Sequence, residues 1–134
     1  MKSQVAIEYM IITSIGLMFI LLSSDYLLKT FQSYSDENSI SIAKNTVQKI
    51  GQSSDLVFSQ GPPAKVKIEI SIPKGIQEIS FSNKTLLFKV KTSSGVNDVF
   101  YETIPQIVGS LPSKNGDYYI SLTAEQGYVN VSVV

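Results

Sequence analysis

Residues 4–24 read QVAIEYMIITSIGLMFILLSS, and this stretch decides the fold. The run from Tyr9 to Ser24 carries no charge and would extend about 24 Å as an α-helix. A membrane crossing needs about 20 apolar residues, so residues 5–7 complete the span if Glu8 lies near the cytoplasmic boundary. Lys2 stands on the same side of the run, which favours a cytoplasmic N-terminus. The stretch therefore predicts a membrane-spanning helix near the start of the chain.

Glu8 is the only acidic residue among the first 24. An uncompensated carboxylate beside hydrocarbon is costly, and an acid retained in such a position usually serves a function. Glu8 is therefore the first candidate for a functional site.

The residues around Glu8 resemble the class III signal peptide of archaeal type IV pilin-like proteins. That motif combines a short basic leader, cleavage just before a Gln, and a Glu-Tyr pair near the start of an apolar helix. Here Ser3–Gln4 matches the junction and Glu8-Tyr9 matches the pair. The resemblance covers about the first 30 residues, and the remainder matches the family only in layout.

The resemblance implies that residues 1–3 are a leader removed by a prepilin-peptidase-like membrane protease. Glu8 would then be the fifth residue of the mature chain, where type IV pilins carry Glu. Cleavage would create a new α-amino group on Gln4, and in a filament this ammonium would pair with Glu8 of a neighbouring subunit. Two such charges are tolerable together in a dry core, whereas either one alone is not.

Two other interpretations of the segment stay open. An ordinary secretory signal peptide would be cut after Ser23 or Ser24, although Leu22 stands where a cut after Ser24 needs a small residue. In a plain membrane anchor, Glu8 would simply extend its carboxylate to the interface.

Apolar residues continue at helical spacing beyond the span, and no proline occurs before Pro62. The pattern predicts one helix over residues 4–60, with a membrane or filament-core part at 4–28 and an amphipathic part at 29–60. The polar cluster at 33–39 predicts a kink, a frayed turn or a break. Gly16 would allow close helix packing or would be a neutral small residue. The apolar residues that carry the later spacing are Leu27, Leu28, Phe31, Tyr34, Ile40, Ala43, Val47, Ile50 and Val57.

Residues 61–134 change to the alternating pattern of β-strands. Gly61-Pro62-Pro63 ends the helix, and about six short antiparallel strands follow, with a loop expected at 105–113. So small a β domain has a thin core by itself. The fold class is therefore α+β, with a long hydrophobic N-terminal helix packed on a small antiparallel sheet or sandwich, the β head.

The amino-acid composition argues against several classes of function. The formal net charge is zero, which gives no electrostatic case for nucleic acid. The chain has no cysteine and no histidine, so it lacks thiolate ligands, thiol nucleophiles and the usual general base. We therefore expect no enzyme, no cofactor and no metal site.

Two Asn-x-Ser/Thr triplets are candidate N-glycosylation sites, at Asn83 in an expected hairpin loop and at Asn130 on the last strand. The aromatic side chains of the β head are expected to be half-buried strand residues, with a sticky surface or carbohydrate platform as the other interpretation. They are Tyr101, Tyr118, Tyr119 and Tyr128.

The expected function is that of a structural subunit of an archaeal type IV-like surface filament, polymerising through its N-terminal helix, with adhesion ranked first. Its partners would be copies of itself, the processing protease, a pilus assembly ATPase with its membrane platform, and lipid before assembly. The precursor would sit in the membrane and the product in a cell-surface filament. The alternatives are a monomeric, membrane-anchored surface protein whose β head binds a ligand, and a minor pilin or pseudopilin of a secretion or adhesion system.

Overall fold

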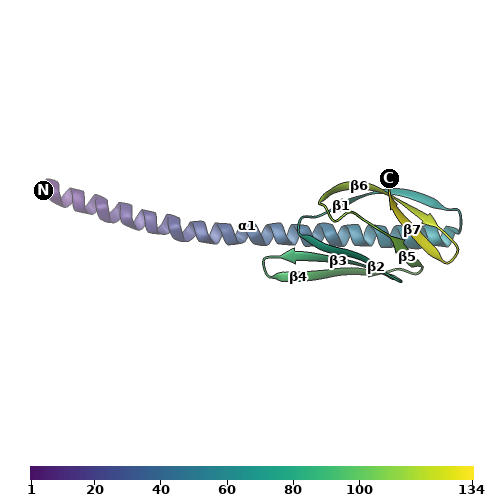
Figure 1. The fold of residues 1–134 in the computed structure, drawn as a ribbon. Coiled ribbons are helices and arrows are strands. Elements are labelled where there is room, and N and C mark those ends of the chain that lie inside the picture. Colours follow the sequence, from purple (N-terminus) through teal and green to yellow (C-terminus); the bar gives the residue numbers. More distant parts are fainter. The chain divides into compact units, whose positions relative to one another are not determined.

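The computed structural model describes all 134 residues and contains one helix and seven strands (Figure 1). The chain divides into two compact units, Met1–Ser35 and Asp36–Val134. We call them the N-terminal unit and the head unit and describe each by itself. The elements are α1 (Lys2–Gln60), β1 (Lys65–Ile72), β2 (Ile76–Ser82), β3 (Thr85–Thr92), β4 (Gly95–Glu102), β5 (Gln106–Gly109), β6 (Gly116–Ala124) and β7 (Tyr128–Val133).

The predicted long helix is confirmed, since α1 runs from Lys2 to Gln60. It ends where expected, at Gly61, whose φ of 77° lies in the left-handed region that favours glycine after a helix. The polar cluster at 33–39 is helical throughout, so the break considered there is absent. The Ser33 hydroxyl donates a hydrogen bond to the Lys29 carbonyl, four residues earlier in the helix, at 3.1 Å.

The strands form two sheets, a four-stranded sheet in the order β1-β6-β7-β5 and a three-stranded sheet in the order β2-β3-β4. All neighbouring strands pair antiparallel except β5 and β7, which are parallel. The loop expected at 105–113 is therefore partly wrong, because Gln106–Gly109 forms β5. Pairing with β7 and burial of Ile107 hold this short strand in the sheet.

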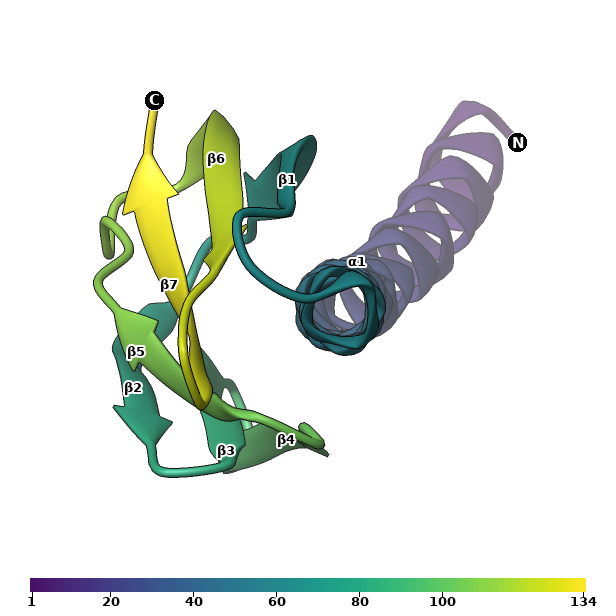
Figure 2. The same ribbon diagram turned by 90° about the vertical axis from the view of Figure 1, so that its right-hand side faces the viewer.

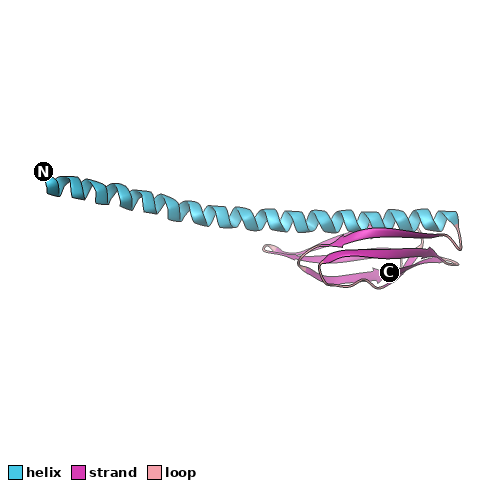
Figure 3. Cartoon of the chain, turned by 90° about the horizontal axis from the view of Figure 1, so that it is seen from above, coloured by secondary structure: helices cyan, strands magenta, loops and turns pink.

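The core of the head unit lies between the second half of α1 and the two sheets. Ala43, Val47 and Ile50 lie on one face of the helix and are at most 1% exposed. The end-on view in Figure 2 shows β1 and β4 nearest to the end of α1, and Figure 3 shows the strands along one side of the second half of the helix. The helix thus forms one wall of the head. The strand residues of the core are Ile70, Ile72, Leu86, Phe88, Val90, Val99, Ile107, Ile120, Leu122, Val129 and Val131.

Hydrogen bonds attach α1 to β1. The Thr46 hydroxyl donates to the Ser71 carbonyl at 2.5 Å, and the Lys49 ammonium donates to the Glu69 carbonyl at 2.6 Å. Because β1 is the outer strand of its sheet, these bonds use carbonyl groups that would otherwise lie open along the edge.

A second attachment joins α1 to the end of β4. The Asp55 carboxylate accepts the Ile104 N–H at 2.8 Å and the Tyr101 hydroxyl at 3.2 Å. The Tyr101 ring lies directly against Gly51, where a Cβ atom would collide with it. Burial, and then the hydrogen bond to Asp55, raise the pKa of Tyr101. Tyr101 is thus a packing residue of the head rather than part of an outer surface.

Asp36 holds the turn between β3 and β4. Its carboxylate accepts the Ser93 N–H at 2.9 Å and also the Ser93 hydroxyl. The hydroxyl and then the N–H of Ser93 lower the pKa of Asp36 below 3.8. Because the folded-state pKa is lowered, the contact stabilises the fold fully above about pH 4 and loses this effect as the pH falls through the lowered pKa.

We therefore expect the Ser93 amide resonance to move between pH 7 and pH 2 with a midpoint below 3.8. Asp36→Asn should abolish this step, whereas the exposed-site variant Glu125→Gln should retain it. An NMR titration of the head unit measures both, and a midpoint at or above 3.8 would contradict the contact.

Candidate functional site

The surface of the N-terminal unit is the most unusual feature of this chain. Every residue from Met1 to Lys29 is exposed, although the stretch is long and apolar enough to cross a membrane. Monomeric soluble proteins rarely expose contiguous apolar surface of more than a few hundred Å². Such a surface could insert in a membrane or pack against other apolar helices. Its large side chains include Val5, Ile7, Tyr9, Met10, Ile11, Ile12, Ile15, Leu17, Met18, Phe19, Ile20, Leu21 and Leu22.

Three hydroxyl groups in this surface, those of Thr13, Ser14 and Ser24, donate hydrogen bonds to the helix itself. Thr13 donates to the Tyr9 carbonyl at 2.8 Å, and Ser14 donates to the Met10 carbonyl at 2.7 Å. Near the end of the charge-free run, Ser24 donates to the carbonyl four residues earlier at 2.8 Å. A hydroxyl bonded in this way does not need water, so these residues are compatible with an apolar surrounding.

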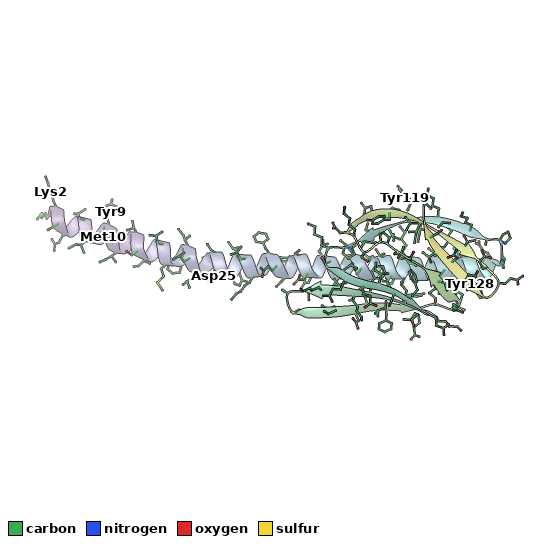
Figure 4. All side chains as sticks on the ribbon, viewed as in Figure 1. Lys2, Tyr9, Met10, Asp25, Tyr119 and Tyr128 are labelled. Atoms are coloured by element: carbon green, nitrogen blue, oxygen red, sulfur yellow. The ribbon has the colours of Figure 1, made fainter.

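Gln4 and Glu8 lie four positions apart and therefore on the same face of α1. Both side chains are exposed. Tyr9, which is labelled in Figure 4, is 68% exposed. The Glu8 carboxylate has no ion-pair partner in this chain, because the one side-chain ion pair present joins Lys89 to Glu78. The carboxylate is thus available to a group from another molecule.

The Ser3–Gln4 junction is itself helical, since α1 begins at Lys2. Gly16 lies in the same exposed helix, and a Cβ atom placed there would meet nothing within 4 Å. A shallow apolar groove precedes it, lined by Ile7, Met10, Ile11, Ser14 and Ile15. Gly16 stands nine positions after Ile7, which at about 100° per residue places it on the opposite face of α1 from the groove. The two features therefore offer places of close approach to other helices on different faces.

Both candidate glycosylation sites are exposed. Asn83 begins the two-residue turn between β2 and β3 and has a φ of 55°, which Asn tolerates better than most residues. Its carbonyl accepts the Ile107 N–H at 2.8 Å, a backbone hydrogen bond that attaches the turn to β5. Asn130 lies on β7 between Val108 and Thr123 of the adjacent strands, with its side chain on the outer face.

The tyrosines of the head do not gather into one platform. Tyr119 and Tyr128, exposed by 53% and 37%, lie at separate places on the head (Figure 4). The Lys67 ammonium stands 5.1 Å from the centre of the Tyr119 ring, a cation–π contact. Tyr118 is half-buried and donates its hydroxyl to the Lys114 carbonyl at 3.2 Å.

Two carboxylates that organise the head were not singled out from the sequence. Asp36 and Asp55 each accept a backbone N–H from a residue more than 45 positions away. Such contacts leave no local pattern, because the partner is brought near only by the fold. Their role is to attach α1 to the strands.

Comparison of this chain with protein-family models, with curated proteins and with solved structures gives no match, so its function has to be argued from its own residues.

Proposed function

We propose that this protein is a structural, non-enzymatic subunit of an archaeal type IV pilin-like surface filament. The observation that carries the proposal is the exposed apolar half of α1 with a single acid near its start. A membrane anchor needs only the apolar side chains. A polymerising helix also has a use for a carboxylate that has no partner within the chain.

The assembly step exchanges one apolar surrounding for another. Before assembly the span lies in lipid, and afterwards it lies among the helices of other subunits. Because both surroundings are apolar, the hydrophobic effect hardly distinguishes them, and packing and polar contacts determine the geometry. Gly16 and the groove beside Ile11 offer packing sites on opposite faces of the helix, and Glu8 provides the polar contact.

Removal of residues 1–3 supplies the partner for Glu8. A prepilin-peptidase-like protease would cut before Gln4 and leave an ammonium group at the new N-terminus. Paired with Glu8 of a neighbouring subunit, this ammonium neutralises a carboxylate that would otherwise be buried alone. An assembly ATPase and its membrane platform would extract the processed subunit, and the heads would face outward.

The native N-terminus tests this proposal. We expect mass spectrometry of cell-surface material to find a mature chain that starts at Gln4, and electron microscopy of the same sheared material to show filaments. A chain that retains Met1 and remains in the membrane fraction would favour an anchored monomer. A start near Asp25 would instead indicate an ordinary secretory signal peptide, and either result would contradict the proposal.

A further inference from the structure

Two of the four outer strands of the head unit lie away from α1. The outer strands are β1 and β5 in one sheet and β2 and β4 in the other. The end-on view in Figure 2 shows β1 and β4 beside the end of the helix and β2 and β5 on the far side. We call the side formed by β2 and β5 the open side. Outer strands with uncovered backbone groups can pair with other chains, so proteins usually cover or charge them.

Asn83 stands on the open side, at a place where the two sheets are joined. It follows directly after β2, and its carbonyl accepts the Ile107 N–H of β5 at 2.8 Å. The next carbonyl, that of Lys84, accepts the N–H and the hydroxyl of Thr103 at 2.7 and 3.0 Å. Both carbonyl groups of the turn are thus bonded to the head, while the side chains of Asn83 and Lys84 are exposed.

The two Asn-x-Ser/Thr triplets differ in how easily an enzyme can reach them. The triplet at Asn83 includes a hairpin turn, and acceptors of this kind lie in surface loops of exported proteins. The triplet at Asn130 lies within β7, which pairs with β6 on one side and β5 on the other. Its middle residue, Val131, is 2% exposed. A transferase that surrounds its acceptor would have to open the sheet at Asn130, whereas Asn83 needs no such opening.

We propose that Asn83 carries an N-linked oligosaccharide and that Asn130 does not. The donor is an oligosaccharide joined through its anomeric carbon to the phosphate of a polyprenol lipid. The amide nitrogen of Asn83 forms a bond to that carbon, and the bond between the carbon and the phosphate oxygen breaks. The lipid phosphate leaves with the bonding electrons, and the nitrogen gives up one proton to the transferase. The step involves no oxidation or reduction.

The oligosaccharide covers the open side. An attached oligosaccharide is bulky and solubilising, and at Asn83 it begins beside β2 and close to β5. It therefore hinders the pairing of these outer strands with the strands of another head. The inference requires only that the head be exported, a condition that a filament subunit and an anchored monomer share.

Peptide mass spectrometry of cell-surface material from the cells that naturally make the protein tests the modification. Cleavage after lysine separates the two triplets, because Lys84 and Lys114 lie between them. We expect the Asn83 peptide to carry an added oligosaccharide mass at least about tenfold more often than the Asn130 peptide. Absence of the added mass at Asn83, or comparable occupancy at Asn130, would overturn the proposal.

Three variants assign the added mass to its triplet. Thr85→Ala destroys the acceptor triplet but keeps Asn83, so the added mass should disappear. Thr85→Ser preserves the triplet and should retain the mass. Ser132→Ala destroys the second triplet and should change nothing, because Asn130 is unmodified. An added mass that persists in Thr85→Ala, or that is lost in Ser132→Ala, would contradict the assignment.

Sedimentation of the full-length chain in detergent, which covers the apolar half of α1, tests the role of the oligosaccharide. Thr85→Ala should associate into larger species at a concentration at least about tenfold lower than Thr85→Ser or the natural protein. If Thr85→Ala and Thr85→Ser sediment alike, the oligosaccharide does not keep the heads apart.

The outcomes separate this inference from the filament function. An oligosaccharide at Asn83 of a chain that retains Met1 and stays in the membrane would support the inference and refute the filament. Filaments built from a chain without added mass would refute the inference and support the filament.

Discussion

A fragment of residues 36–134 will fold by itself, whereas residues 61–134 will not. The reason is that α1 supplies one wall of the core. Val47, Ile50 and Val57 are each at most 1% exposed. Burial of each such side chain contributes roughly 1.5–3 kcal/mol, and whole domains are stable by only about 5–15 kcal/mol. Removal of the helix takes away stabilisation comparable with that whole margin.

The shorter fragment also loses the contacts that close the sheet edges. Thr46 and Lys49 no longer reach β1, and Asp55 no longer accepts the Ile104 N–H. Outer strands with open backbone groups are prone to pair with other chains. We therefore expect residues 61–134 to aggregate or to remain unfolded.

Circular dichroism melting and NMR dispersion measure this difference. Within residues 36–134, Ile50→Ala should lower the free energy of unfolding by about 2–5 kcal/mol. Leu56→Ala, on the same helix but 55% exposed, should change it by less than about 0.5 kcal/mol. A cooperative melting transition in the isolated 61–134 fragment would show that the helix is not part of the core.

Local sequence patterns predict those parts of this fold that depend on local chemistry. The helix is predictable because apolar spacing persists without proline as far as Pro62. β1 is predictable because Val66, Ile68, Ile70 and Ile72 alternate with polar residues, and the structure turns these four inward. β3 follows the same rule, with Leu86, Phe88 and Val90 buried.

The elements that sequence patterns miss depend on distant partners. β5 has only Ile107 and Val108 as apolar residues, too few for a visible alternation, and its strand conformation comes from pairing with β7. The Asp36–Ser93 contact spans 57 positions. No local pattern encodes such a contact, because the carboxylate would look solvated until the fold brings the turn to it.

The sequence points to Glu8 as a candidate site residue, and the structure shows its surroundings. The sequence identifies Glu8 because it is the only acidic residue in a long apolar stretch. The structure adds that this carboxylate has no ion-pair partner in its own chain and that Gln4 shares its helix face. The partner proposed for it belongs to a second molecule, which a single chain cannot contain.

Glu8→Ala will leave the subunit in the membrane but prevent filament growth. The apolar span from Tyr9 to Ser24 is unchanged, so insertion and cleavage before Gln4 should proceed normally. In the filament, however, the new ammonium group of Gln4 would be buried without a counter-charge. Loss of one partner of a buried ion pair costs about 3–5 kcal/mol, so we expect filament yield to fall by about 100-fold or more.

Three measurements distinguish this explanation from a general defect. Mass spectrometry of the membrane fraction should find Glu8→Ala chains that start at Gln4, which shows that processing is intact. Glu8→Gln, with nearly the same shape and no charge, should fail like Glu8→Ala, because the carboxylate charge and not the side-chain volume neutralises the amine. Glu37→Ala removes an exposed carboxylate from the same helix within the head unit and should assemble at the natural rate. If Glu8→Gln also assembles at that rate, the ammonium has another partner and the role assigned to Glu8 is wrong.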